Sequence, residues 1–126
     1  MLNKRLEDSL IVNNQLSSQD LLDAFKLQLA KDFEQSNFPA EFVASLQPGY
    51  EEILAKIALE LQRNEKKTDF NIMHLLYRVD ISESQLKRYL DKNKDKSYFS
   101  VIAELIVKRV LQKVVIKQHY KNHESS

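Results

Sequence analysis

Histidine and carboxylate pairs are the residues of this sequence whose type and spacing could support chemistry. His119 and His123 lie four residues apart, a spacing at which two imidazoles on one helix face can bind a metal ion. Glu124 is the one further ligand nearby, and two serines follow it. We therefore interpret residues 119–126 as a frayed polar tail, and we predict no metal site.

The third histidine and the acidic pairs favour structural roles. His74 lies between Met73 and Leu75 in an expected helix, and the sequence identifies no nucleophile or orienting partner for it. Glu51 and Glu52 lie in the first turn of another expected helix, where carboxylates stabilise unpaired backbone N–H groups. The single glycine excludes a glycine-rich phosphate loop. We predict a protein that is not an enzyme and that takes no cofactor.

The stretch from residue 75 to residue 90 offers a different chemistry, the binding of nucleic acid. Its apolar residues have the inward spacing of a helix-turn-helix unit, namely Leu75, Val79, Ile81, Leu86 and Tyr89. The sequence ISESQLKRYL at residues 81–90 resembles the turn and second helix of helix-turn-helix DNA-binding domains. This resemblance covers about 20 residues. It implies a nucleic-acid-binding surface made of Ser84, Lys87 and Arg88 at the major groove and Lys92, Lys94 and Lys96 at the phosphates.

Two positions depart from the helix-turn-helix pattern. Asp80 stands where glycine is usual, and Leu76 stands where a small residue lets the two helices approach. Both departures favour a wider corner between ordinary packed helices, with solvated Lys87 and Arg88. The formal net charge of only +1 favours the same interpretation. The run LLYRVD at residues 75–80 also resembles a segment of small helical bacterial proteins, a likeness that implies no activity.

The elements that position these residues are expected to be helices. One Gly and two Pro in 126 residues make a turn-rich β architecture improbable. The composition, 43% hydrophobic and 29% charged, fits one globular domain. We predict an all-α, single-domain bundle of five or six helices over residues 1–126, and residues 1–16 receive no firm assignment.

The cellular compartment follows from what the sequence lacks. It has no cysteine, which excludes disulfides and suits a reducing compartment. Glu7 and Asp8 interrupt the apolar run that an export signal needs, and no run approaches the roughly 18 residues of a spanning helix. We expect a cytoplasmic protein with no membrane partner.

Apolar periodicity defines the first three helices. The first covers residues 19–35, with Ser17 and Asp20 placed as a capping box. A short second helix begins at Pro39, where a fixed φ and a missing N–H cost least. The third covers residues 50–61, whose apolar residues recur every three or four positions.

The fourth helix is expected over residues 70–79. Thr68 or Asp69 is a suitable cap for its start. Its expected interior residues are Phe70, Met73, Leu76 and Tyr77.

The boundary of the fifth helix is the sharpest local signal. Ser82 and Gln85 form a capping box, while Ile81 can pack on Leu86 as a hydrophobic staple. The fifth helix therefore begins at Glu83.

The last helix, expected over residues 98–118, is apolar over much of its circumference. One stripe consists of Phe99, Ile102, Ala103, Ile106, Val110 and Val114, and Val107, Leu111 and Val115 widen it. Polar residues are expected on the remaining side, namely Glu104, Lys108, Gln112 and Lys113. A helix so broadly apolar is central, with neighbours or a second copy of the chain around it.

Charge is distributed unevenly between the two parts of the chain. Residues 1–85 carry 9 basic and 14 acidic side chains, a formal charge of −5, against 10 and 4 in residues 86–126, a charge of +6. Either the two parts pack against each other, or a basic face meets an acidic partner. We predict a protein-interaction module that binds another protein or a second copy of itself, and nucleic-acid binding is the alternative.

Overall fold

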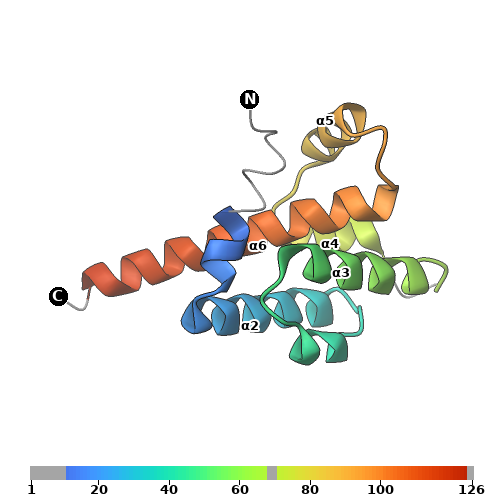
Figure 1. The fold of residues 1–126 in the computed structure, drawn as a ribbon. Helices are drawn as coiled ribbons and strands as arrows, with labels where there is room; N and C mark the ends of the chain where they lie inside the picture. Colours follow the sequence, from blue (N-terminus) through green and yellow to red (C-terminus); the bar gives the residue numbers. More distant parts are fainter. Residues whose placement is uncertain (1–10, 68–70, 125–126) are drawn as a thin grey trace.

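The computed structural model describes residues 11–67 and 71–124, except for the side chains of residues 122–124. Most of these residues are helical. A helical stretch at residues 11–16 is followed by α2 (Gln19–Gln35), the 3₁₀ helix η1 (Glu41–Ser45), α3 (Tyr50–Asn64), α4 (Ile72–Arg78), α5 (Glu83–Lys92) and α6 (Tyr98–Glu124). These residues contain no strand, so the all-α prediction is confirmed (Figure 1).

The central element is α6, as its wide apolar circumference predicts. It packs against α2, α3 and α5, and Figure 1 shows it running across the whole molecule. Seven consecutive residues, 101–107, are buried, and seven residues complete almost two helical turns. Other elements therefore cover α6 on every side over this stretch. Even so, none of the described helices has the length and apolar character needed to cross a membrane.

The predicted apolar stripes of α2 and α3 form the rest of the core. The bounds predicted for α2 are confirmed at both ends. In α3 the buried residues include Tyr50, Ile53, Ile57 and Leu61, four members of the predicted stripe. The backbone N–H of Tyr50 donates to Asn13 Oδ1 (2.9 Å), which ties the start of α3 to the helical stretch at residues 11–16.

Two helices end in a left-handed residue without using glycine. Asn37 after α2 and Asp80 after α4 both have a φ of 63°, a conformation that Asn and Asp tolerate better than other side chains. At the end of α2, the N–H of Phe38 donates to the carbonyl of Phe33 (2.9 Å), and the two rings lie 5.8 Å apart. This arrangement is a Schellman motif with its hydrophobic contact. The end of α4 follows the same pattern, since the N–H of Ile81 donates to the carbonyl oxygen of Leu76 (2.9 Å).

The capping box predicted at Ser17 and Asp20 is wrong. The N-cap of α2 is Ser18, whose side chain makes no capping bond within the part of the chain that is described. Ser17 Oγ donates instead to the carbonyl of Asn14 (2.7 Å), and its N–H donates to the carbonyl of Asn13 (3.0 Å). Ser17 therefore belongs to the turn that closes the preceding helical stretch.

The second and fourth helices also begin later than predicted. Pro39 precedes the N-cap of η1, and the element is a 3₁₀ helix of five residues. The N-cap of α4 is Asn71, whose side chain accepts from the backbone N–H groups of Met73 (2.9 Å) and His74 (3.3 Å). The caps proposed at residues 68 and 69, and Phe70, lie outside the described residues.

The buried face of α4 differs from the prediction. Leu75 and Leu76 are buried, whereas Met73 is 37% exposed and Tyr77 is 79% exposed. Two adjacent leucines set the inward direction of this short helix. Met73 and Tyr77 each lie two residues from Leu75, which places them about 200° away around the axis.

The predicted start of α5 at Glu83 is confirmed. Ser82 is the N-cap, and its Oγ accepts from the N–H of Gln85 (3.1 Å). Ile81 and Leu86 are both buried in the core, as the hydrophobic staple requires. The returning bond from the Gln85 side chain stays a prediction.

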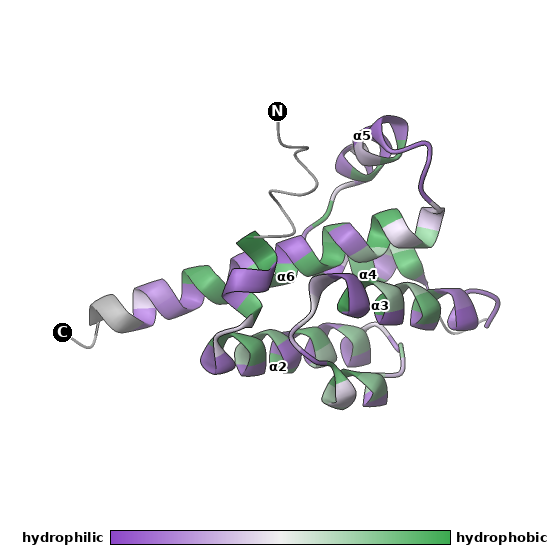
Figure 2. Cartoon of the chain, in the orientation of Figure 1, coloured by the Kyte–Doolittle hydropathy of each residue, from purple (hydrophilic) through white to green (hydrophobic). Residues whose placement is uncertain are grey.

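The last helix is longer than predicted. It ends at Glu124 and not at Gln118. Ser97 Oγ accepts from the N–H of Ser100 (3.2 Å) and so caps its beginning. In Figure 2, hydrophobic residues concentrate where α6 is flanked by other helices, and hydrophilic residues dominate its projecting end.

Candidate functional site

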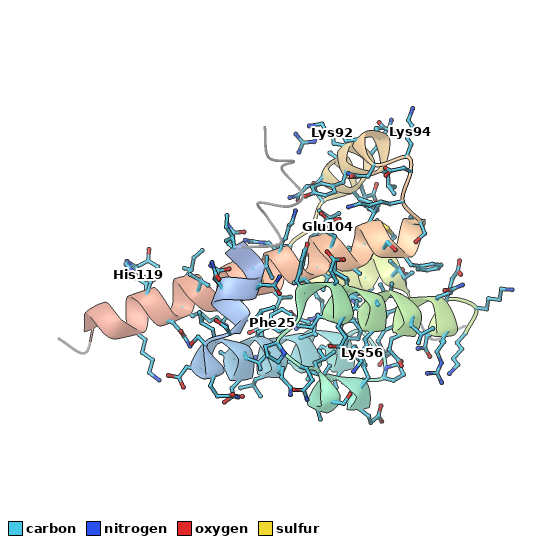
Figure 3. All side chains as sticks on the ribbon, viewed as in Figure 1. Phe25, Lys56, Lys92, Lys94, Glu104 and His119 are labelled. Atoms are coloured by element: carbon cyan, nitrogen blue, oxygen red, sulfur yellow. The ribbon has the colours of Figure 1, made fainter. Side chains whose placement is uncertain are left out.

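Five of the six residues predicted to bind nucleic acid are exposed. They lie on α5 and in the turn after it, and they are Ser84, Lys87, Arg88, Lys92 and Lys94. Figure 3 shows Lys92 and Lys94 at the outer edge of this region. The sixth, Lys96, turns inward, and its Nζ lies 2.5 Å from Glu104 Oε2. Lys96 is therefore committed to an internal ion pair.

The corner between α4 and α5 has the turn backbone of a helix-turn-helix unit, but its two helices pack on different neighbours. Asp80 adopts the left-handed backbone that glycine would supply, so Asp at this position, where helix-turn-helix units usually have Gly, still allows the turn. However, α4 packs chiefly on α2, while α5 packs on α6. Asp80 Oδ2 lies 3.6 Å from both Arg109 Nη2 and Lys113 Nζ, which attaches the corner to α6.

A buried carboxylate on α6 is the clearest polar feature that sequence reasoning missed. Glu104 was expected on the solvated side of the helix, and this prediction is wrong because the residue is only 6% exposed. Its Oε1 accepts from Lys108 Nζ (3.2 Å), and its Oε2 pairs with Lys96. Lys108 also donates to the hydroxyl of Tyr89 (2.8 Å), and its ammonium lies 5.4 Å from the centre of that ring. We call these four residues the Glu104 cluster.

The Glu104 cluster joins three parts of the fold. Glu104 and Lys108 come from α6, Tyr89 comes from α5, and Lys96 comes from the loop between these helices. A buried carboxylate needs compensating donors, and two ammonium groups supply them here. The spacing of Glu104 and Lys108 was visible in the sequence as an i, i+4 pair, but nothing in the sequence placed Lys96 beside them.

Tyr50 adds a second unusual group next to the Glu104 cluster. Its hydroxyl is buried and has no hydrogen-bond partner among the described residues. Burial, and secondarily the negative charge of Glu104, raise the pKa of this phenol well above its ordinary value. The hydroxyl therefore remains protonated at physiological pH and is a donor.

A second candidate region lies where the helical stretch at residues 11–16 crosses α6. An open groove of about 320 Å³ separates the two elements. We call it the C-terminal groove, and its lining includes Ile11, Val12, Leu111, Gln112, Val115 and Ile116. Its walls are largely apolar, which is typical of surfaces that bind another protein.

We call the part of α6 beyond Val114 the arm. Lys117 and Gln118 near its base still contact α2, and its end projects past the other helices (Figure 1). Ile116 is 45% exposed and Tyr120 is 65% exposed on it, and Ile11 at the groove is 57% exposed. By contrast, Val107 and Leu111 are buried by the chain itself. Ile11 and Ile116 at the groove and Tyr120 on the arm are exposed apolar residues, as are Leu27, Leu59 and Tyr77 on α2, α3 and α4.

The arm also carries the predicted histidine pair. His119 is exposed on the arm, and its ring centroid lies 6.1 Å from that of Tyr120 (Figure 3). The side chain of His123 lies outside the description. Among the described residues, no group of three or more His, Asp or Glu side chains could hold a metal ion.

Comparison of the chain with protein-family models, with curated proteins and with solved structures gives no significant match.

Proposed function

We propose that the chain is a non-enzymatic protein-interaction module that self-associates through the C-terminal groove and the arm. The observation that carries this proposal is the combination of an open apolar groove with the exposed side chains of Ile11, Ile116 and Tyr120 beside it. Exposed apolar patches of this kind mark interaction surfaces. The absence of cysteine suits a cytoplasmic setting for the module.

The spacing along α6 supports a second copy of the chain as the partner. Gln112 lines the groove and Tyr120 stands on the arm, each four residues from Ile116. In an antiparallel pair of α6 helices centred on Ile116, each Tyr120 meets the groove of the other copy at Gln112. The same patch then serves both subunits, as a two-fold interface requires.

The charges along this surface are compatible with such pairing. Gln112, Ile116 and Tyr120 carry no charge, and the one cation that lines the groove, Lys108, is paired with Glu104. Lys117 is turned away from this line, since its Nζ donates to Gln28 Oε1 on α2 (3.0 Å). Aromatic residues in neutral, apolar surroundings are frequent binding hot spots.

Sedimentation velocity over micromolar concentrations tests the proposal with a matched pair of tyrosine variants. We expect wild-type dimers, and we expect Tyr120→Arg to weaken dimerisation at least about tenfold, the effect of losing a moderate hot spot. Tyr77→Arg is the control, because Tyr77 is also exposed to solvent (79%, against 65% for Tyr120) but lies on α4 and does not line the groove. A monomeric wild type at the highest concentration, or equal dimerisation of both variants, would contradict the proposal.

Nucleic-acid binding is the second candidate, and the left-handed Asp80 favours it because the turn backbone is attainable. The surface would consist of Ser84, Lys87, Arg88, Lys92 and Lys94. Binding of random duplex DNA at two salt concentrations tests this alternative. Phosphate contacts weaken steeply as salt rises, so absence of binding at low salt would exclude it.

A further inference from the structure

Cations from three helices gather on the surface where α2, α4 and α6 meet. In α6 a basic residue recurs at every fourth position from Arg109 to Lys121, and this spacing keeps the side chains along one flank of the helix. Arg78 of α4 lies beside this row, because its carbonyl accepts from Lys113 Nζ (3.2 Å). Lys31 is an exposed cation of α2. We call the set the basic face, and its members are Lys31, Arg78, Arg109, Lys113, Lys117 and Lys121.

Neutral groups hold several of these cations in place without cancelling their charge. The guanidinium of Arg78 donates to Gln35 Oε1 on α2, and Lys117 Nζ donates to Gln28 Oε1 on the same helix (3.0 Å). Lys113 Nζ donates to a backbone carbonyl, that of Arg78. Amide and carbonyl oxygens carry no formal charge, so these bonds position the cations and leave their positive charge for a partner.

The acids near the basic face compensate it only in part. Asp80 Oδ2 lies 3.6 Å from two cations of the α6 row, but its side chain is 63% exposed, so solvent screens both pairs. Asp32 lies beneath the face. Its burial raises its pKa, while Lys113, Arg78 and Lys31 oppose that rise. Cations from α6, α4 and α2 therefore lie around one buried carboxyl.

The composition of this surface indicates the kind of partner that it fits. Amides lie between the cations, at Gln28, Gln35 and Gln118, and Asp20 at the start of α2 adds an exposed acid where its carbonyl accepts from Gln118 (3.5 Å). Interfaces between proteins are depleted of lysine, whereas interfaces with nucleic acid are polar and strongly positive. Lys, Arg and Gln side chains all bind phosphate oxygens. Nucleic acid therefore fits this surface better than an acidic protein does.

We propose that the basic face binds the phosphate backbone of nucleic acid without reading its sequence. The row from Arg109 to Lys121 rises about 18 Å along the axis of α6, which matches about five phosphates of one strand. This surface is distinct from the cations of α5. It is also distinct from the proposed dimer surface, because Lys117 is rotated by about 100° around the helix from Ile116. The proposal does not depend on dimerisation.

Fluorescence anisotropy of a labelled random duplex of about 20 base pairs, at about 50 mM and 200 mM salt, tests this proposal. We expect the affinity to fall about a hundredfold between the two salt concentrations, the loss expected for about four phosphate contacts. A second duplex of unrelated sequence should bind equally well. Labelled polyglutamate should bind more weakly than either duplex, because it offers carboxylates and no phosphates.

Two double variants with the same change of charge locate the binding surface. Lys117→Glu with Lys121→Glu reverses two exposed cations of the row and should weaken duplex binding at least about tenfold at low salt. Lys87→Glu with Lys92→Glu is the matched control, because it reverses two exposed cations of α5, and it should weaken binding less. Thermal transitions show whether both variants are folded. Lys117→Gln should lower the salt slope by about one, and it decides the question if the α6 double variant is unfolded.

Four results would overturn the proposal. Absence of duplex binding at low salt would exclude a phosphate-binding surface. Equal losses in the two double variants would show that only overall charge matters, and a larger loss in the α5 variant would assign binding to α5. Polyglutamate that binds as tightly as the duplex would point to an acidic protein partner. A monomeric wild type would contradict the proposed dimer and would leave each of these comparisons unchanged.

Discussion

The buried segment of α6, residues 101–114, and its arm are parts of one helix with similar apolar residues and different surroundings. Both contain β-branched residues, such as Ile106 in the buried segment and Ile116 in the arm. Ile106 is fully buried by neighbouring helices, whereas Ile116 is half-exposed. Apolar periodicity thus identifies a helix face that must be covered, while the position of the neighbouring elements decides whether the chain itself covers it.

The largest expected effect comes from shortening the same residue type in each region. Ile106→Ala should lower the free energy of unfolding by about 2–5 kcal/mol, because it leaves a cavity in the packed core. Ile116→Ala should lower it by about 0.5 kcal/mol or less, since that side chain is half-solvated in a single copy. Urea denaturation at low protein concentration measures both. Equal losses would contradict the division between the two regions.

A smaller difference is expected for polar residues of the two regions. Glu104→Gln should cost about 2 kcal/mol, since it leaves the ammonium groups of Lys96 and Lys108 beside an uncharged amide in a buried site. Lys117→Gln in the arm should cost about 0.5 kcal/mol or less, because its contact with Gln28 is exposed. Urea denaturation of both variants tests this, and a nearly neutral Glu104→Gln would show that the Glu104 cluster adds little stability.

The smallest effect concerns pH and the carboxyl of Asp32 on α2. Burial raises its pKa above the ordinary value of 3.8, while Lys113 of α6, a hydrogen bond from Gln28, and Arg78 act in the opposite direction. A raised pKa in the folded state means that its stabilising contribution is complete below pH 3.8 and is lost as pH rises through the folded pKa. Ionised Asp32 therefore destabilises the fold at neutral pH.

Asp32→Asn should remove this pH dependence and slightly stabilise the protein at pH 7. The amide oxygen can still accept from Gln28, as Asp32 Oδ1 does (3.1 Å). Urea midpoints at about pH 4 and pH 7 for wild type and variant measure the change. A variant less stable than wild type at pH 7 would mean that attraction to Lys113 and Arg78 outweighs the cost of burial.

Much of the fold follows from periodicity and local capping. The bounds of α2 and the starts of α3, α5 and α6 agree with the sequence predictions, because long apolar stripes and the Ser82 cap are local signals. The cap at Asn71 and the exposure of Met73 and Tyr77 were missed. A helix of only two turns contains too few apolar residues to define its inward direction.

The candidate sites were less accessible to sequence reasoning. The broad apolar circumference of α6 indicated a partner, but only the packing shows that Leu111 is covered and Ile116 is half-exposed. Similarly, Lys96 was predicted to contact phosphates because its neighbours are basic, whereas a contact with Glu104 eight residues later determines its direction. Such contacts depend on how a loop turns, and side-chain spacing does not encode this.

The position of α6 in the chain also bears on how the protein is made. Its apolar surface completes the cover over α2 and α3, yet it is synthesised after both of them. During translation, the inward faces of the two earlier helices are therefore without their main neighbour until the α6 segment has left the ribosome. Such intermediates expose hydrophobic surface and are prone to aggregation.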